Sequence, residues 1–276
     1  MAERECNNTS CTKESCAGCA QSAQQSMLAP KNKYSNIGKV IAVMSGKGGV
    51  GKSMVTASLA VELAKKGYKV GILDSDITGP SIPKMFGMNE GAQSDGECLY
   101  PAESKKDIKV MSVNLLLEDT EEPVIWRGPV IAGVVKQFWT DVRWGDLDYL
   151  LIDMPPGTGD VPLTVYQSLP VDGAIVVTSP QDLVKLIVKK AYNMAAKMDI
   201  PVLGIVENYS YLECPDCGKK LSIFGESKVD EVAAGLNLPV LGKLPIVSKY
   251  AELADKGAFD EVENPYLEEA IKAITA

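Results

Sequence analysis

The amino-acid sequence predicts an α/β fold with a doubly wound, mostly parallel β-sheet. Apolar runs of strand length alternate with helical patterns from residue 39 to the end of the chain. Near-continuous apolar strands separated by amphipathic helices are typical of a parallel sheet that is covered on both faces. A glycine-rich loop also joins the first predicted strand to the first predicted helix, which is where open α/β folds bind ligands. A chain of 276 residues is long enough for one such domain.

The predicted strands and helices follow one another in a regular order. The expected strands are Val40–Met44, Val70–Leu73, Ile108–Val113, Tyr149–Ile152, Ala174–Thr178, Val202–Val206 and Val240–Leu244. The clearest helical patterns are Met54–Lys66, which ends at Gly67, and Asp182–Met198, which opens after Pro180. Residues 87–106 show no hydrophobic period, so we expect an irregular excursion at the surface there.

Residues 1–36 differ from the rest of the chain. They are polar, rich in Cys, Ser, Gln and Asn, and without a hydrophobic period. A segment of this composition has too little apolar surface to form a packed core. We therefore expect a flexible, cysteine-rich arm over residues 1–36 and one folded domain over residues 37–276.

The composition excludes several classes of function. The net charge of −8 argues against a nucleic-acid partner, because neutralising phosphates takes basic clusters, and weakly against an anionic membrane partner. The N-terminus is polar from Met1 to Gln25 and no apolar run approaches a membrane span, so we expect a cytoplasmic protein with reduced thiols. The chain has no histidine, which excludes His-assisted nucleophiles and mixed Cys/His zinc sites.

The run GKGGVGKS, residues 46–53, fits the phosphate-binding pattern G-x-x-x-x-G-K-[ST]. Successive glycines let the backbone turn its N–H groups inward, and the following helix N-terminus favours negative charge. We expect Lys52 to reach the terminal phosphates and the Ser53 hydroxyl to bind Mg²⁺. The sequence thus predicts an ATP-type nucleotide site with contacts from Gly46, Lys47, Gly48, Gly49, Val50, Gly51, Lys52, Ser53 and Met54.

Lys47 is a second cation in a loop that needs only one. From its spacing alone it is equally well a solvated loop lysine. The loop resembles, however, the deviant Walker A loop of the dimerising MinD/ParA/nitrogenase-iron-protein class, in which the extra lysine reaches across a dimer interface to the partner's phosphates. The resemblance implies a P-loop ATPase fold and a catalytic Lys47 that acts with Lys52 on the transferring phosphoryl group.

Two carboxylates at strand ends are predicted to complete the nucleotide site. Asp153 ends an apolar strand, where an Asp of a P-loop fold holds Mg²⁺ through water; an Asp that caps a turn is the alternative. The following run MPPGTGD forms a rigid loop whose N–H groups can sense the terminal phosphate. In the run DSDITGPS one carboxylate is expected to orient the attacking water or a Mg²⁺-bound water. The same resemblance selects Asp76, while Asp74 ends the strand.

Two residues are predicted to contact the base of the nucleotide. Asn208 follows the strand Val202–Val206, and its amide has both a donor and an acceptor for the adenine edge. The resembled class uses an Asn at this point, and a turn Asn is the alternative. Pro245 follows the last strand, where it and its neighbours offer an apolar wall for the base.

The cysteines distinguish between possible functions. Cys214 and Cys217 form a C-x-x-C knuckle, in which two thiolates can hold one metal or cluster. Two thiolates are half of a four-thiolate site, and two-fold symmetry would supply the other pair from a second copy of the chain. A bridging [4Fe–4S] cluster and a four-cysteine zinc both satisfy this requirement. A redox disulfide is the third alternative, although that motif usually opens a helix.

The arm contains four further cysteines with C-x₄-C-x₄-C-x₂-C spacing, which are Cys6, Cys11, Cys16 and Cys19. Four thiolates on a short segment can wrap a cluster without help from the fold, and zinc is the alternative ligand. Cys98 is isolated in the surface excursion, and we expect it to be an ordinary thiol.

Several motifs together resemble the Mrp/Nbp-type ATPases. They are, in chain order, GKGGVGKS, DSDITGPSIP, the turn Trp126–Pro129, DMPPGTGD and CPDCG, and the resemblance covers roughly residues 37–270. It implies a P-loop carrier that assembles iron–sulfur clusters and transfers them to apo-proteins. The cysteine-rich arm is similar to that of the Nbp branch, which holds a second cluster, although the spacing here is tighter than the first gap of eukaryotic members.

The leading hypothesis is therefore a homodimeric, slowly hydrolysing ATPase that carries a [4Fe–4S] cluster. A MinD/ParA-like positioning ATPase is a second hypothesis, but the tail PYLEEAIKAITA lacks the basic amphipathic character needed for a membrane or DNA. An ATP-driven electron-transfer iron protein is a third hypothesis, and a zinc-stabilised dimer with plain ATPase activity is the fourth.

Overall fold

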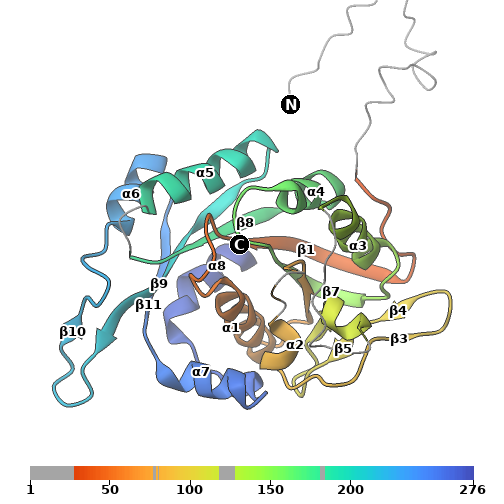
Figure 1. The fold of residues 1–276 in the computed structure, drawn as a ribbon, viewed down its shortest axis with the longest axis horizontal. Coiled ribbons are helices and arrows are strands. Elements are labelled where there is room, and N and C mark those ends of the chain that lie inside the picture. The colour runs from red at the N-terminus through yellow and green to blue at the C-terminus, as the bar shows by residue number, and fades with distance from the viewer. Residues whose placement is uncertain (1–27, 77–78, 80, 118–127, 181–183) are drawn as a thin grey trace, which may run out of the picture.

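The core of the protein is a single twisted β-sheet (Figure 1). The computed structural model describes residues 28–76, 79, 81–117, 128–180 and 184–276. Within these residues the sheet has nine strands in the order β10-β9-β8-β1-β7-β2-β6-β5, with β11 also paired to β9. The strands are β1 (Ser35–Met44), β2 (Val70–Asp74), β5 (Ala102–Glu103), β6 (Lys109–Met111), β7 (Gly145–Asp153), β8 (Gly173–Thr178), β9 (Val202–Glu213), β10 (Lys220–Leu221) and β11 (Val240–Pro245).

The centre of the sheet is parallel and its two edges are antiparallel. β1 pairs in parallel with β7 and β8, β2 with β6 and β7, and β9 with β8 and β11. The short strands β5 and β10 are antiparallel to β6 and β9. Because the carboxyl ends of parallel strands lie along one edge, the loops after β1, β2 and β7 meet there.

Helices cover both faces of the sheet, as expected for a doubly wound fold (Figure 1). Alternate residues of β1 enter opposite layers: Ala42 and Met44 pack in one layer, and Ile41 and Val43 in the other. The first layer contains α3 (Gly128–Thr140), α4 (Asp160–Ser168), α5 (Val184–Lys197) and α6 (Val229–Leu236). The second contains α1 (Lys52–Lys65), α2 (Ile82–Met85), α7 (Ser248–Asp255) and α8 (Glu268–Thr275).

Helix α1 passes through the centre of the second layer. Its residues Leu59 and Leu63 are fully buried against the sheet. Burial of each such side chain stabilises the fold by about 1.5–3 kcal/mol. This packing fixes the N-terminus of α1 at the carboxyl edge of the sheet, directly after the glycine-rich loop.

Each predicted strand is present, and so are both predicted helices, with changes at their ends; the predicted start of the second helix at Asp182 lies outside the described residues. β9 continues to Glu213, well past the predicted end at Val206, and β6 covers only the centre of the predicted run 108–113. The expectation of an irregular segment at 87–106 was partly wrong. That segment forms the hairpin β3 (Gln93–Ser94) and β4 (Leu99–Tyr100), and it also adds β5 to the sheet edge.

The chain before β1 packs on the domain from residue 28 onward. The Ala29 amide donates to the Ser168 carbonyl at 2.7 Å, and the Trp139 indole donates to the Ala29 carbonyl at 3.1 Å. Since β1 begins at Ser35, the predicted boundary after residue 36 falls inside that strand. Among the described helices, none combines the length and the apolar character needed to cross a bilayer.

Candidate functional site

The glycine-rich loop between β1 and α1 is held from two sides. Gly51 has a left-handed φ of 75°, and a Cβ there would lie 2.2 Å from Asn208 Nδ2. A Cβ at Gly46 would lie 2.2 Å from Cγ2 of Ile187 in α5. Glycine is therefore required at Gly51 for both conformation and space, and at Gly46 for space. The loop is the tight backbone cradle that its sequence predicts.

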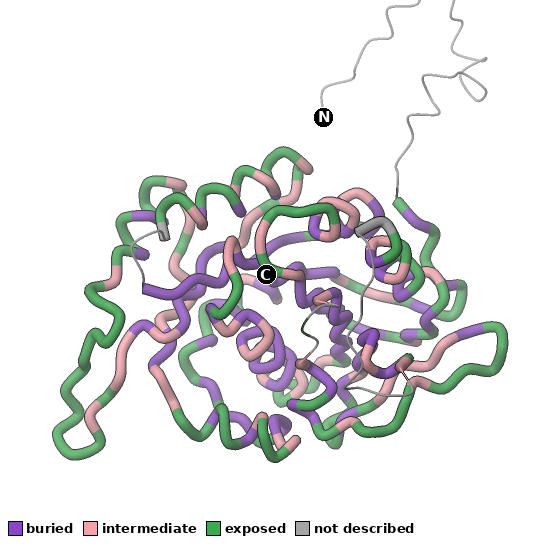
Figure 2. The backbone as a smooth tube through the Cα atoms, in the orientation of Figure 1, coloured by how far each residue is buried: buried purple, intermediate pink, exposed green. Residues whose placement is uncertain are grey.

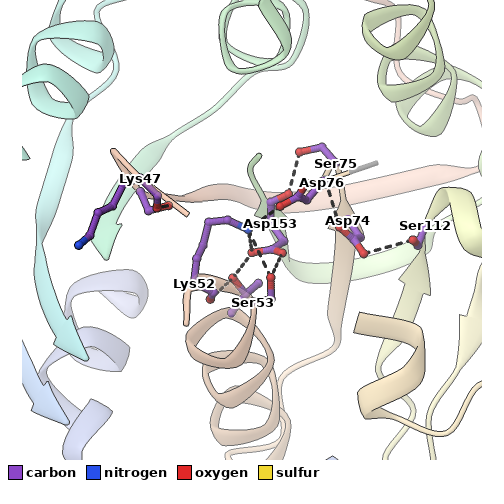
Figure 3. Close-up of polar contacts among 10 residues, drawn as sticks. Lys47, Lys52, Ser53, Asp74, Ser75, Asp76, Ser112 and Asp153 are labelled. Atoms are coloured by element: carbon purple, nitrogen blue, oxygen red, sulfur yellow. Dashed lines mark hydrogen bonds and ion pairs between the residues drawn. The ribbon is translucent and has the colours of Figure 1, made fainter. Parts of the chain in front are cut away.

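A buried ion pair lies at the base of this loop (Figure 3). Lys52 is only 5% exposed, and its Nζ lies 2.7 Å from Asp153 Oδ1 at the end of β7. Ser53 Oγ donates to Asp153 Oδ2 at 2.6 Å, and Thr56 Oγ1 donates to Asp153 Oδ1 at 2.7 Å. The first turn of α1 is thereby tied to Asp153. Thr56 was not predicted, although it follows Ser53 by three residues and so shares its helix face.

The end of β2 brings two more carboxylates to the same place. Asp76 Oδ2 lies 4.0 Å from Lys52 Nζ, so the predicted residue faces the lysine. Asp74 points instead into the protein, where its carboxylate accepts hydrogen bonds from the Asp76 N–H at 3.1 Å and from Ser112 Oγ at 3.2 Å (Figure 3). Burial, and then the nearby charge of Asp153, raise the pKa of Asp74 well above its ordinary value.

A cleft of about 550 Å³ opens from this centre. Its lining includes the polar side chains of Lys52, Ser53 and Asp76, and the apolar side chains of Ile246, which precedes α7, and Tyr250, which lies in α7. Charged and apolar groups in one cleft fit a nucleoside polyphosphate. The hydroxyl and carboxylate oxygens of Ser53 and Asp76 are the hard ligands that Mg²⁺ prefers. Ile246 belongs to the predicted apolar wall, whereas the residues of α7 were not predicted, because no motif marks them in the sequence.

The two residues that were predicted to contact the base, Pro245 and Asn208, differ in their position relative to the cleft. Pro245 lines the cleft as expected. The Asn208 side chain is fully buried beneath the loop, where its Nδ2 donates to the Val50 carbonyl at 2.9 Å, and Tyr209 lines the cleft beside it. Contact of Asn208 with a base stays a prediction.

Lys47 lies apart from the buried centre. Its side chain points away from Lys52 and Asp153 (Figure 3), and its carbonyl accepts a hydrogen bond from Ser45 Oγ at 2.9 Å. A lysine in this orientation faces outward from the loop. The catalytic role of Lys47 at the phosphates of a partner stays a prediction.

The C-x-x-C knuckle is the tip of the β9–β10 hairpin, which extends from the edge of the sheet (Figures 1 and 2). The Cys214 N–H donates to the Lys219 carbonyl at 3.0 Å, and the Gly218 N–H to the Cys214 carbonyl at 2.9 Å. Both thiols are free, with Cys217 exposed and Cys214 half-buried. The backbone N–H groups of Asp216 and Cys217 lower the pKa of the Cys214 thiol.

Within the described residues, no group of three or more Cys, His, Asp or Glu side chains is arranged to hold a metal. The knuckle therefore offers two sulfur ligands from one chain. The predicted arm ligands Cys6, Cys11, Cys16 and Cys19, and the turn residues Trp126 and Arg127, lie outside the described residues. Cys98 is buried at 4% exposure, rather than lying free on the surface, and it accepts a hydrogen bond from Asn32 Nδ2 at 3.6 Å.

The sequence is similar to those of iron–sulfur carriers. The ParA family model described as "NUBPL iron-transfer P-loop NTPase" matches residues 36–276. The chain is 48% identical over 266 residues to the "Iron-sulfur cluster carrier protein" of Clostridium perfringens, which covers 92% of this chain and 93% of the relative. It is 45% identical over 260 residues to the protein of the same name from Methanocaldococcus jannaschii, which covers 93% of this chain and 90% of the relative.

Solved structures show the same architecture. A nucleotide-binding protein from Archaeoglobus fulgidus, in complex with ADP, matches with a TM-score of 0.76 at 48% identity, covering 84% of this chain and 91% of that chain. The MinC:MinD complex of Aquifex aeolicus matches with a TM-score of 0.61 at 22% identity, covering 86% and 94%, and supports the fold alone. The predicted MinD/ParA-like P-loop fold is confirmed. The chain belongs to the ParA family, as a P-loop NTPase of the NUBPL iron-transfer kind.

Proposed function

We propose that this chain is an ATP-dependent carrier that holds an iron–sulfur cluster between two copies of itself and transfers it to apo-proteins. One observation carries the proposal: a P-loop centre and an exposed two-thiol knuckle occur in the same domain. Two relatives that match 92% and 93% of this chain are named iron–sulfur cluster carrier proteins, which supports the same cargo here.

We expect hydrolysis to be slow, with nucleotide binding acting as a switch. Lys52 would exchange its ion pair with Asp153 for the terminal phosphates, and Ser53 and Asp153 would hold Mg²⁺. A bound Mg²⁺ would supply charge neutralisation at the phosphates. Asp76 orients the attacking water, and Lys47 of a second copy stabilises the charge on the transferring group.

The knuckle supports a cluster shared by two chains. Cys214 and Cys217 supply half of the sulfur ligands of a [4Fe–4S] cluster, and the same pair from a second copy supplies the rest. The side chains of Leu221, Ile223 and Phe224 follow the knuckle and are exposed by 38%, 54% and 46%. Exposed apolar side chains next to a site support a protein contact at that place. We assign a second cluster to the four cysteines of the arm.

Anaerobic reconstitution of the full chain tests the shared cluster. The double variant Cys214→Ser/Cys217→Ser is expected to lose the iron and sulfide of the bridging cluster and to lose the dimer that cluster loading produces, because no sulfur pair remains at the hairpin. The matched control is Cys98→Ser, which removes a thiol away from the knuckle. Iron and sulfide analysis with sedimentation velocity gives both readouts. Retention of the full cluster content and the dimer by the double variant would refute the proposal.

A further inference from the structure

β9 contains a bulge between the nucleotide cleft and the knuckle. In its pairing with β11, Lys243 lies opposite Glu207 and Pro245 lies opposite Tyr211. Between these two pairs β9 advances by four residues while β11 advances by two. Tyr209 lies inside this bulge with a left-handed φ of 57°. The bulge is closed by Ser210 Oγ, which donates to Glu207 Oε2 at 2.6 Å, and both of these side chains are buried.

The backbone of Tyr209 is strained. A bulky side chain in the left-handed region costs about 1–2 kcal/mol, which is why Gly, Asn and Asp usually occupy it. Such strain persists only where the surroundings hold it, and it is concentrated at functional sites. Here the bulge turns the Tyr209 side chain toward the phosphate loop: a Cβ on Gly51 would lie 2.8 Å from the tyrosine hydroxyl. The side chain also lines the cleft.

On the other side of the bulge the same strand leads directly to the cysteines. The Ile246 N–H, from the cleft wall, donates to the Tyr211 carbonyl at 2.7 Å. Lys220 Nζ lies 4.3 Å from the centroid of the Tyr211 ring, and Lys220 pairs with the residue that precedes Cys214. Cys214 follows Tyr209 by five positions, about 17 Å of extended chain. Within the described residues, β9 is the strand that contacts the phosphate loop and also continues into the knuckle.

We infer that Tyr209 is a positioning residue that couples occupancy of the nucleotide cleft to the geometry of the Cys214–Cys217 knuckle. A nucleotide that contacts the phenol ring favours one conformation of the bulge over another. A change of backbone region at Tyr209 shifts the strand segment that ends at Cys214. The effect is limited to the difference in nucleotide affinity between the two conformations. The inference rests on the proposed function for the identity of the ligand in the cleft.

The reactivity of the thiols tests this coupling without any cluster. The full-length, reduced, metal-free protein is pulsed with N-ethylmaleimide, and peptide mass spectrometry gives the alkylation rate of each cysteine. The rates are compared with and without Mg²⁺ and a non-hydrolysable ATP analogue, at a concentration that saturates each variant. Sedimentation velocity records the oligomeric state, and variants are compared in the same state. The buried thiol of Cys98 reports global unfolding in the same sample.

In the wild type we expect the analogue to change the rate at Cys214 or Cys217 about fivefold, at the lower end of allosteric couplings. In Tyr209→Gly, which removes the ring and the strain, the ratio of alkylation rates with and without the analogue falls to about one at an analogue concentration that saturates this variant. Tyr209→Phe keeps the ring and is expected to restore the ratio. Asn237→Gly relieves a left-handed residue with φ of 54° at the end of α6 and serves as the control that keeps the wild-type ratio.

Two results would overturn the inference. One is a wild-type protein whose knuckle thiols are alkylated at the same rate with and without the analogue. The other is a Tyr209→Gly protein that binds the analogue and keeps the wild-type ratio of alkylation rates. If glycine prevents folding, Tyr209→Asn removes the ring with a residue that tolerates the same backbone region. Failure of the proposed cargo would be seen separately, in the reconstitution experiment. There the double variant Cys214→Ser/Cys217→Ser would bind as much iron and sulfide as the wild type. That failure leaves the ratio of alkylation rates unchanged.

Discussion

Asp74 shows how the nucleotide centre makes the fold depend on pH. The folded chain keeps this carboxyl group protonated to a higher pH than the ordinary value of 3.8, first because of burial and then because of the charge of Asp153. Between 3.8 and the raised pKa, the unfolded chain releases a proton that the folded chain retains. The stability of the wild type therefore falls as the pH rises through that window.

The substitution Asp74→Asn removes this titration. An amide keeps an acceptor for the Asp76 N–H and cannot ionise. We expect the unfolding free energy of Asp74→Asn, relative to wild type, to increase from pH 4 to pH 7, as measured by urea unfolding at each pH. Asp148→Asn is the matched control, since Asp148 is exposed and also accepts a backbone N–H, from Lys69 at 2.7 Å. A difference that stays flat or shrinks with pH would contradict the account.

At the scale of the element, the phosphate loop depends on contact with β9. Gly51→Ala adds a Cβ in a left-handed residue and directs it at Asn208 Nδ2, 2.2 Å away. Gly67→Ala has similar backbone strain, at φ of 89°, but meets nothing within 4 Å, so it is the matched control. Both variants lose about 1–2 kcal/mol to strain. We expect Gly51→Ala to lose about 1–3 kcal/mol more, because the neighbours must move.

Urea unfolding gives the two stability losses, and titration with ADP gives the consequence for the site. Gly51→Ala is expected to lose nucleotide binding as well, because the Val50 carbonyl and the Asn208 amide no longer meet at 2.9 Å. Equal stability losses in the two variants would show that β9 does not confine the loop.

The sequence predicted those elements whose signal is local. The apolar runs of β1, β2, β7 and β8 and the spacing of Gly46, Gly51 and Lys52 sufficed to predict the sheet and the phosphate loop. Tyr209 was missed because a tyrosine carries no signal for the left-handed region, and only the pairing of β9 with β11 creates the bulge. The α7 wall of the cleft was missed for a similar reason: it becomes part of the site through packing of distant segments.

At the scale of the whole molecule, the two functional regions lie at different places on one sheet. The phosphate loop lies over the sheet centre, after β1, while the knuckle extends from the β9–β10 hairpin at the edge (Figure 1). If the proposed chemistry holds, neither region is complete in one chain. The knuckle supplies two of the four sulfur ligands, and the phosphate site needs Lys47 of a partner. Two-fold pairing of the chain would complete both at once.

A mixing experiment distinguishes a Lys47 that acts on the partner's site from one that acts on its own. Lys47→Ala and Asp76→Asn are each expected to slow ATP hydrolysis about 10²–10³-fold, since each site loses one group that acts on the transferring phosphoryl or the attacking water. In a mixed dimer, one site combines Asp76 of the Lys47→Ala chain with Lys47 of the Asp76→Asn chain. With random pairing, about a quarter of all sites regain both groups.

We therefore expect an equal mixture of the two inactive variants to recover about a quarter of the wild-type phosphate release per site. The outward orientation of Lys47, away from Lys52 and Asp153, is consistent with this result (Figure 3). If Lys47 acts on its own phosphate loop, each site of a mixed dimer still lacks one group, and the mixture stays as inactive as its components. A mixture of Lys47→Ala with a Lys47→Ala/Asp76→Asn double variant is the control, because no pairing of those chains restores a complete site.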